Sequence, residues 1–104
     1  MSTNNSSKTP SKLQKIMDAG HFGVTSECGP PRGADGKVVE EKAHLIGDYV
    51  DAINITDNQT AVVRLCSLAS CIRLKQLGYD PILQMSPRDR NRIGMQADIL
   101  GAAS

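Results

Sequence analysis

Tryptophan is absent from this chain of 104 residues, and aromatic side chains make up only 3% of it. Phe22, Tyr49 and Tyr79 are the complete aromatic set. A hydrophobic content of 39% is adequate for the core of one small domain. We therefore expect a single domain whose core is built from aliphatic side chains.

Net charge and long apolar runs are also lacking. The formal net charge is +1, which argues against a basic surface for nucleic acid. No stretch approaches the ~18 apolar residues of a transmembrane helix. From the low net charge we expect no nucleic-acid partner, and from the lack of long apolar runs we expect no membrane partner. Residues 1–10 are polar and are expected to form a disordered tail. They contain no apolar segment typical of a signal peptide, so we expect a cytoplasmic protein. Residues 11–104 are then the folded part.

Cysteine and metal motifs are scarce. Cys28, Cys66 and Cys71 form no C-x-x-C pair, and their odd number favours reduced thiols over a disulfide framework. Cys66 and Cys71 fall in a helical pattern and are expected to be small buried apolar residues. His21 and His44 are isolated, which disfavours a zinc site. Glycine motifs for dinucleotides, phosphate-binding loops and nucleophile elbows are missing.

What the chain does contain is an alternation of strand and helix patterns behind one short helix at residues 11–19. Alternating strands and helices predict a parallel sheet with right-handed crossovers, an α/β fold. The predicted strands cover residues 22–28, 52–56 and 81–85, and the helices cover residues 35–49, 60–77 and 89–103.

Apolar stripes at helical spacing predict which side chains are buried. In the first long helix, Asp35 is a candidate cap, and Val39 and Ala43 mark the buried face. The phase of the first strand places Phe22 and Val24 beneath the helices. The stripe of the second long helix is Ala61, Leu65, Leu68, Ala69 and Ile72, and that of the last helix is Ile93, Gln96, Ala97 and Leu100.

The three strands begin about 30 residues apart, close to the roughly 31 residues that each unit of a (β/α)8 barrel occupies. The spacing is consistent with three βα units of an incomplete TIM barrel. An open doubly wound sheet has a similar period, so spacing alone leaves both architectures open.

Polar side chains stand at the carboxyl end of each predicted strand, namely Glu27, Thr56 and Gln84. The carboxyl ends of parallel strands meet at one rim, so a shared ligand site is expected there, with solvated strand ends as the alternative. A carboxyl group in a half-buried mouth is suited to general acid catalysis. For Glu27, the competing interpretation is an ion pair with Arg32 or Arg88.

A charged segment, Arg88-Asp89-Arg90-Asn91-Arg92, opens the last helix. Arginines and N–H groups at a helix start can hold a phosphate group. The alternative is a solvated turn whose charges pair with one another. The segment is short and lacks aromatic neighbours, which disfavours a nucleic-acid patch.

Four motifs in order resemble the methylenetetrahydrofolate reductase family: S-E-C-G-P-P-R-G-A, V-D-A-I-N-I-T-D-N-Q-T-A-V-V-R, P-I-L-Q-M-S-P-R-D-R-N-R-I and Q-A-D-I-L-G-A-A. The resemblance covers roughly residues 12–104. It implies the first three βα units of a flavin barrel, with FAD at the carboxyl ends of the strands. The implied reaction reduces 5,10-methylenetetrahydrofolate to 5-methyltetrahydrofolate, a step of one-carbon metabolism and methionine biosynthesis.

The same resemblance implies roles for single residues. Glu27 matches the glutamate that acts as general acid on the folate, Thr56 matches a flavin-contacting threonine, and Gln84 stands where relatives carry another flavin contact. The rim of the flavin pocket would include Arg88, Asp89 and Arg90. Aromatic residues follow the glutamate in many members, whereas Cys28 and Gly29 follow it here.

Partners implied by the resemblance are the folate substrate and an electron donor, either a reduced pyridine nucleotide or another donor. A homo-oligomer or a partner subunit is compatible with it. An aspartate near the flavin and most of the folate pocket belong to later strands, so the 104-residue chain is expected to be inactive alone. Two other hypotheses remain open: a small phosphate- or nucleotide-binding α/β module, and an inactive remnant.

Overall fold

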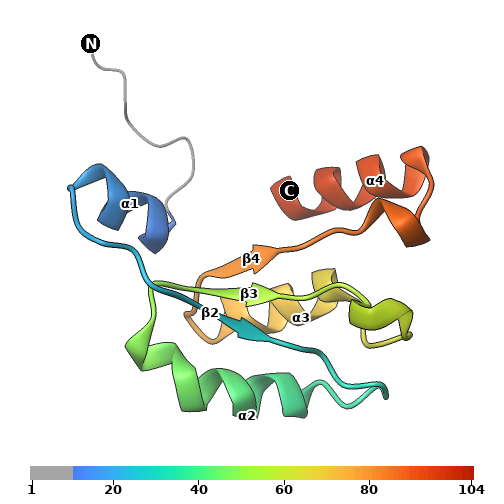
Figure 1. Ribbon diagram of the computed structural model, residues 1–104, viewed down its shortest axis with the longest axis horizontal. Helices are drawn as coiled ribbons and strands as arrows, with labels where there is room; N and C mark the ends of the chain where they lie inside the picture. The colour runs from blue at the N-terminus through green and yellow to red at the C-terminus, as the bar shows by residue number, and fades with distance from the viewer. Residues whose placement is uncertain (1–10) are drawn as a thin grey trace.

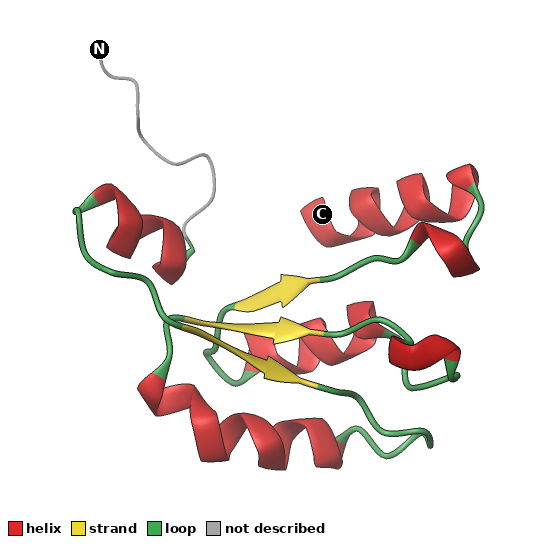
Figure 2. Ribbon diagram, in the orientation of Figure 1, coloured by secondary structure: helices red, strands yellow, loops and turns green. Residues whose placement is uncertain are grey.

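The structure is a computed structural model that describes residues 11–104, so the tail predicted for residues 1–10 lies outside the described residues. Within this part, four α-helices and three strands follow one another (Figures 1 and 2). They are α1 (Lys12–Asp18), β2 (Thr25–Cys28), α2 (Lys37–Ile46), β3 (Ala52–Ile55), α3 (Ser67–Gln76), β4 (Pro81–Leu83) and α4 (Arg92–Ala103). Short 3-10 turns at Gly47–Tyr49, Gln59–Ala61 and Pro87–Asp89 follow α2, β3 and β4.

The three strands form one parallel sheet in the order β2-β3-β4, which confirms the expected α/β class and strand direction. Cys28 of β2 lies beside Ile55 of β3, and Ile55 lies beside Leu83 of β4. Paired residues point to the same face of a sheet. This row therefore forms one apolar face, and α2 and α3 cover it (Figure 1).

The core is aliphatic, as the composition predicts. Ile53, Ile55, Val39 and Leu74 are each at most 1% exposed and pack together between the sheet and the two helices. Burying each such side chain contributes about 1.5–3 kcal/mol. Phe22 and Tyr49, by contrast, are 89% and 82% exposed, and of the aromatic residues only the partly buried Tyr79 packs against this core.

The helix ends at α1 and α2 follow from local sequence. Ser11 caps α1 by accepting a hydrogen bond from the Gln14 backbone N–H at 3.1 Å. Gly20, with φ +83°, ends the helix in the left-handed conformation that glycine adopts without strain. The N-cap of α2 is Gly36 and not the predicted Asp35, although Asp35 accepts from the Lys37 N–H at 3.1 Å. Val39 of α2 is buried as predicted.

The first strand begins at Thr25 rather than at residue 22, and the predicted burial of Phe22 and Val24 is wrong. Val24 instead exchanges hydrogen bonds with Asp51, ahead of the β2–β3 pairing. Gly23 lies against α1, where an added Cβ would stand 3.0 Å from the Leu13 side chain. The segment before β2 therefore passes α1 and lies outside the helix-covered face.

The second long helix begins at Ser67, seven residues later than predicted, and its predicted apolar stripe is wrong, except that Leu65 packs against the core from the loop before the helix. Thr60 and Ala61 have φ of 60° and 59°, a conformation that no right-handed helix contains. The buried face of α3 consists of Ser67, Ser70, Cys71 and Leu74, whereas Ile72 is 51% exposed. Both serine hydroxyls donate to backbone carbonyls, which lets small polar side chains pack against the sheet.

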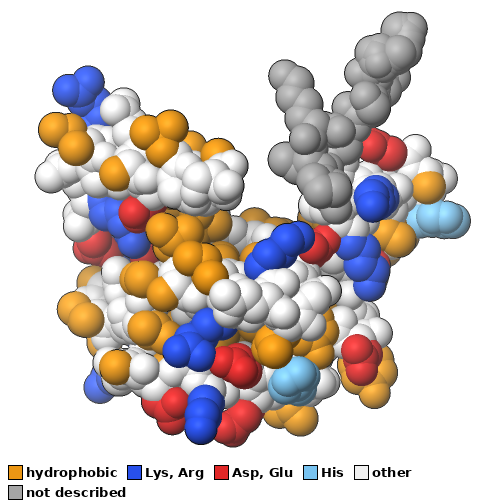
Figure 3. Space-filling model, turned by 180° about the vertical axis from the view of Figure 1, so that it is seen from behind, with side chains coloured by type: hydrophobic (Ala, Val, Ile, Leu, Met, Phe, Trp, Pro, Cys, Tyr) orange, Lys and Arg blue, Asp and Glu red, His pale blue; other side chains and the backbone are white. Residues whose placement is uncertain are grey.

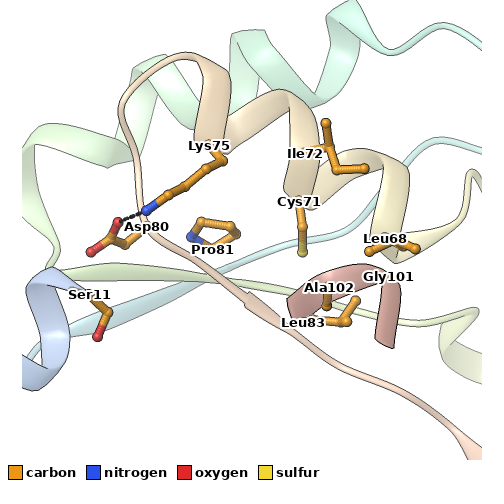
Figure 4. A pocket seen from close by; sticks show the side chains of 10 residues that line it. All are labelled: Ser11, Leu68, Cys71, Ile72, Lys75, Asp80, Pro81, Leu83, Gly101 and Ala102. Carbon is orange, nitrogen blue, oxygen red and sulfur yellow. Dashed lines mark hydrogen bonds and ion pairs between the residues drawn. The ribbon is translucent and has the colours of Figure 1, made fainter. Parts of the chain in front are cut away.

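The last helix begins at Arg92, and its predicted buried stripe is wrong because no residue of α4 is buried. Ile93 and Leu100 are each 72% exposed. Between the carboxyl end of α4, α3 and β4 lies a groove of about 420 Å³, lined among others by Leu68, Cys71 and Leu83 (Figure 4). Hydrophobic side chains reach the surface beneath α4 in the view from behind (Figure 3). Helix α4 thus rests on the fold with few apolar contacts.

Candidate functional site

Polar side chains gather on the sheet face opposite α2 and α3. Glu27 of β2 pairs with Asn54 of β3, and Asn54 pairs with Ile82 of β4. Gln84 stands two residues beyond Ile82, and its backbone N–H donates to the Ile55 carbonyl at 3.3 Å, which continues the pairing. Alternation along the strand returns Gln84 to the face of Ile82. Glu27, Asn54 and Gln84 therefore share one face across three strands.

Asn54 connects the three strands through its side-chain amide. Its Nδ2 donates to the Ser26 carbonyl at 3.3 Å, and its Oδ1 accepts from Gln84 Nε2 at 3.5 Å. The alternation of strand residues put Asn54 on the same face as Thr56, but the sequence alone did not mark it as a site residue. The missed signal is its position two residues before a polar strand tip.

Glu27 is exposed, so the expectation of a half-buried mouth around it is wrong. Within residues 11–104, no ion pair joins Glu27 to Arg32 or Arg88, the partners of the competing interpretation. The physical reason for the exposure is that α2 and α3 cover the other face of the sheet. A carboxylate in this position is free to meet a ligand or water.

Thr56 lies just beyond β3 and is only 5% exposed, yet its hydroxyl has no hydrogen-bond partner among the described residues. A Cβ added at Gly29 would stand 3.6 Å from both Thr56 Oγ1 and Gln59 Nε2. The hydroxyl and the Gln59 amide thus converge beside Gly29. An orphaned buried hydroxyl costs about 1–3 kcal/mol and calls for an explanation.

The loop that follows Thr56 is strained. Asn58, Thr60 and Ala61 have positive φ angles of 46°, 60° and 59°. Asparagine tolerates this region, but a β-branched threonine does not, and such strain clusters at functional sites. The loop is held at Asn58, whose Oδ1 accepts from the Arg64 N–H and whose carbonyl accepts from Arg88 Nη2, each at 2.9 Å.

Asp57 forms the strongest polar contact of the rim. It is 8% exposed and accepts hydrogen bonds from Arg90 Nη1, from Arg90 Nη2 at 2.9 Å and from the Ser86 N–H at 2.6 Å. The Arg90 hydrogen bonds hold the pKa of Asp57 below its ordinary value, and those same bonds to Asp57 raise the pKa of Arg90. Arg90 Nε also lies 3.4 Å from an Asp98 oxygen, which ties α4 to the rim.

Arg88 and Asp89 pair with each other on the surface. Arg88 Nε donates to Asp89 Oδ1 at 2.9 Å and Nη2 donates to Oδ2 at 2.6 Å. The hydrogen bond from Arg88 lowers the pKa of Asp89. The charged turn is therefore self-paired at these two residues, while Arg90 is drawn inward to Asp57. Asp57 was missed in the sequence because its partner lies far along the chain.

The cysteines and the potential metal ligands of residues 11–104 can be compared with the sequence expectations for them. All three thiols are free, with Cys28 and Cys71 buried, but Cys66 is exposed, which corrects its predicted burial. Burial raises the pKa of Cys71 to about 12. No group of three metal-ligating side chains is found in the described residues. None of the helices described has the length and apolar character needed to cross a membrane.

Comparisons of the chain with protein families, with curated proteins and with solved structures return no match.

Proposed function

We propose that this chain carries the first three βα units of a (β/α)8 barrel in a methylenetetrahydrofolate reductase. The observation that carries the proposal is the row of Glu27, Asn54 and Gln84 across three parallel strands. Barrel enzymes bind ligands at the carboxyl ends of their strands. The reaction, reduction of 5,10-methylenetetrahydrofolate to 5-methyltetrahydrofolate in the cytoplasm, comes from the motif resemblance.

The residues present are suited to the polar edge of a flavin ring. Thr56 Oγ1 is a buried hydroxyl without a partner in the described residues, and Gln84 presents an amide oriented by Asn54. Both are neutral groups that can hydrogen-bond a ring edge. In the proposal, Thr56 and Gln84 hold FAD. Once reduced by the electron donor, bound FAD would supply the hydride that reduces the one-carbon unit of the folate.

Glu27 is the proposed general acid. Its exposed carboxyl group, beside the Asn54 amide, would donate a proton to the folate nitrogen whose bond to the methylene carbon breaks, leaving a reactive iminium. Efficient proton transfer needs walls that exclude water. In a barrel those walls come from the further βα units. The 104-residue chain alone is therefore expected to give no turnover.

Arg88, Asp89 and Arg90 would serve the rim indirectly. Arg90 fixes Asp57, and Arg88 holds the Asn58 carbonyl, so both arginines position the loop after β3. A phosphate-binding module, the alternative function, is less well supported because these guanidinium groups already contact carboxylates. The electron donor in the proposal is a reduced pyridine nucleotide or another electron donor.

A titration with FAD, followed by flavin fluorescence, tests the proposal on the purified chain. We expect the wild type to bind FAD, and Thr56→Val and Gln84→Leu to weaken binding about tenfold each, the loss of one hydrogen bond. Lys15→Gln in α1 is the matched control and should bind like the wild type. No menadione reduction is expected.

Equal FAD affinity in all four proteins, or no FAD binding at all, would refute the flavin site. Robust turnover by the isolated chain would refute the partial barrel. Binding of inorganic phosphate that disappears in Arg88→Gln would support the alternative module.

A further inference from the structure

The loop at residues 57–63 combines two features that are each unfavourable in its observed position. It buries the Thr56 hydroxyl without giving it a partner, and it holds Thr60 and Ala61 in the left-handed conformation. These are independent observations, since one concerns a side chain and the other the backbone. Both would be relieved if the tip of the loop moved away from Thr56.

The anchors of the loop define which part can move. At one end Asp57 is held by Arg90 and by the Ser86 N–H. At the other end the Leu65 N–H donates to the Pro31 carbonyl at 2.8 Å. Between these anchors, Gln59, Thr60, Ala61 and Val63 are exposed. The backbone N–H bonds of this part are local ones, from Ala61 to the Asn58 carbonyl and from Val62 to the Gln59 carbonyl. The movable tip is therefore short and carries the Gln59 side chain.

We infer that Gln59 is a removable cover over a binding position at the Thr56 hydroxyl, and that a hydrogen-bonding ring edge of a ligand replaces the Gln59 amide there. The Gln59 amide and the hydroxyl converge beside Gly29, yet no hydrogen bond joins them. An unbonded amide is easily displaced by a group that does bond the hydroxyl. The inference rests on the proposed function only in naming a flavin as this ligand.

Hydrogen exchange on the full 104-residue chain tests the cover without any ligand. Thr60→Gly and Ala61→Gly remove the strain of the closed loop, because glycine adopts positive φ freely. We expect amide exchange at positions 61 and 62, whose N–H groups donate to the Asn58 and Gln59 carbonyls in the closed loop, to slow at least fivefold in each variant, while exchange within α3 changes less. Ala34→Gly, in an exposed loop without positive φ, is the control and should leave residues 59–63 unchanged. Unchanged exchange in both loop variants would overturn the inference.

Measurement of FAD binding by the variants is the second test of the inference. If Gln59 is a cover, Gln59→Ala should tighten FAD binding several-fold and Thr60→Gly should weaken it, while Thr56→Val weakens it through loss of the hydroxyl. FAD binding that falls in Thr56→Val but is unaltered or weaker in Gln59→Ala would overturn the cover and leave the proposed function standing. Absence of FAD binding in every variant would refute the proposed function, and the exchange results would then decide on the cover alone.

Discussion

Asp57 accepts hydrogen bonds from both terminal nitrogens of Arg90, although the two residues stand 33 positions apart in the chain. The side chains are 3% and 17% exposed, so the pair is largely withdrawn from water. Through Asp98, the same arginine reaches α4, which has no buried residue of its own. One ion-pair network thus takes the place of apolar packing in fixing the last helix to the sheet.

Removal of one partner should destabilise the chain strongly. In Asp57→Asn the largely buried Arg90 charge loses its two hydrogen bonds to the carboxylate of Asp57 and keeps only the 3.4 Å contact with Asp98, so we expect a loss of about 3 kcal/mol in the free energy of unfolding. Urea unfolding, followed by circular dichroism, measures it. Asp89→Asn, in the exposed pair with Arg88, is the control and should change the midpoint little. Equal effects of the two variants would contradict the structural role of the Asp57 pair.

Stability should fall in acid because of the same carboxylate. The pKa of Asp57 is lowered in the folded state from its ordinary value of 3.8, so the unfolded chain binds the proton more readily. Its stabilising contribution is therefore complete above about pH 4 and is lost as the pH falls through the lower folded pKa. Urea midpoints measured from pH 7 downward should decline more steeply in the wild type than in Asp57→Asn. If the urea midpoints of the wild type and Asp57→Asn declined equally with pH, Asp57 would not be the cause of the loss of stability in acid.

Thr56→Val should stabilise the chain while removing a proposed ligand contact. Valine has nearly the shape of threonine and lacks the buried hydroxyl that has no partner in the described residues. We expect a gain of about 1 kcal/mol in the free energy of unfolding. Thermal unfolding checks it, with Thr25→Val at an exposed strand position as the control. A clear loss of stability would mean that the hydroxyl has a partner.

The three cysteines should differ sharply in how readily their thiols react with an alkylating reagent. Burial raises the pKa of Cys71 to about 12 and also raises that of Cys28, and only the thiolate form reacts. Exposed Cys66 should therefore be modified alone by iodoacetamide in the native chain, and all three thiols should react in denaturant. Peptide mass spectrometry identifies the modified sites. Rapid native labelling of Cys71 would contradict the packing of α3.

Glu27→Gln tests the proposed acid in an enzyme that contains the complete barrel. Because Glu27 makes no ion pair in the described residues, FAD binding should be unaffected. Formation of 5-methyltetrahydrofolate should fall at least about 100-fold, the usual contribution of a general acid. Flavin reduction by the electron donor is the internal control and should persist. Unaltered folate turnover would exclude the acid role.

Local signals in the sequence were sufficient for the alternation of elements and for the polar face. Apolar runs, the Ser11 cap and Gly20 each act within a few residues, and strand alternation placed Glu27 and Gln84 on one face. The start of α3 was predicted wrongly because residues 60–66 have a helical pattern that tertiary contacts override. The hydrogen bonds of Asn58 to Arg64 and Arg88 favour a turn there.

The contacts of the rim could not be predicted because they join distant segments. Asp57 and Arg90 lie on different loops, and nothing near either residue signals their pairing. The burial of Thr56 depends in the same way on where the Gln59 loop folds back. Exposure of α4 was missed because a stripe such as Ile93, Ala97 and Leu100 predicts burial only when a partner surface meets it.

In the part of the chain that the structure describes, β2 and β4 are the outer strands of the sheet, and they differ in how readily they could recruit a strand from another molecule. β4 is three residues long and starts with Pro81, which has no N–H to offer. β2 has four residues and no proline, so its backbone is the better template. Fibre formation by concentrated protein should therefore begin along β2, and a proline introduced at Ser26 should slow it.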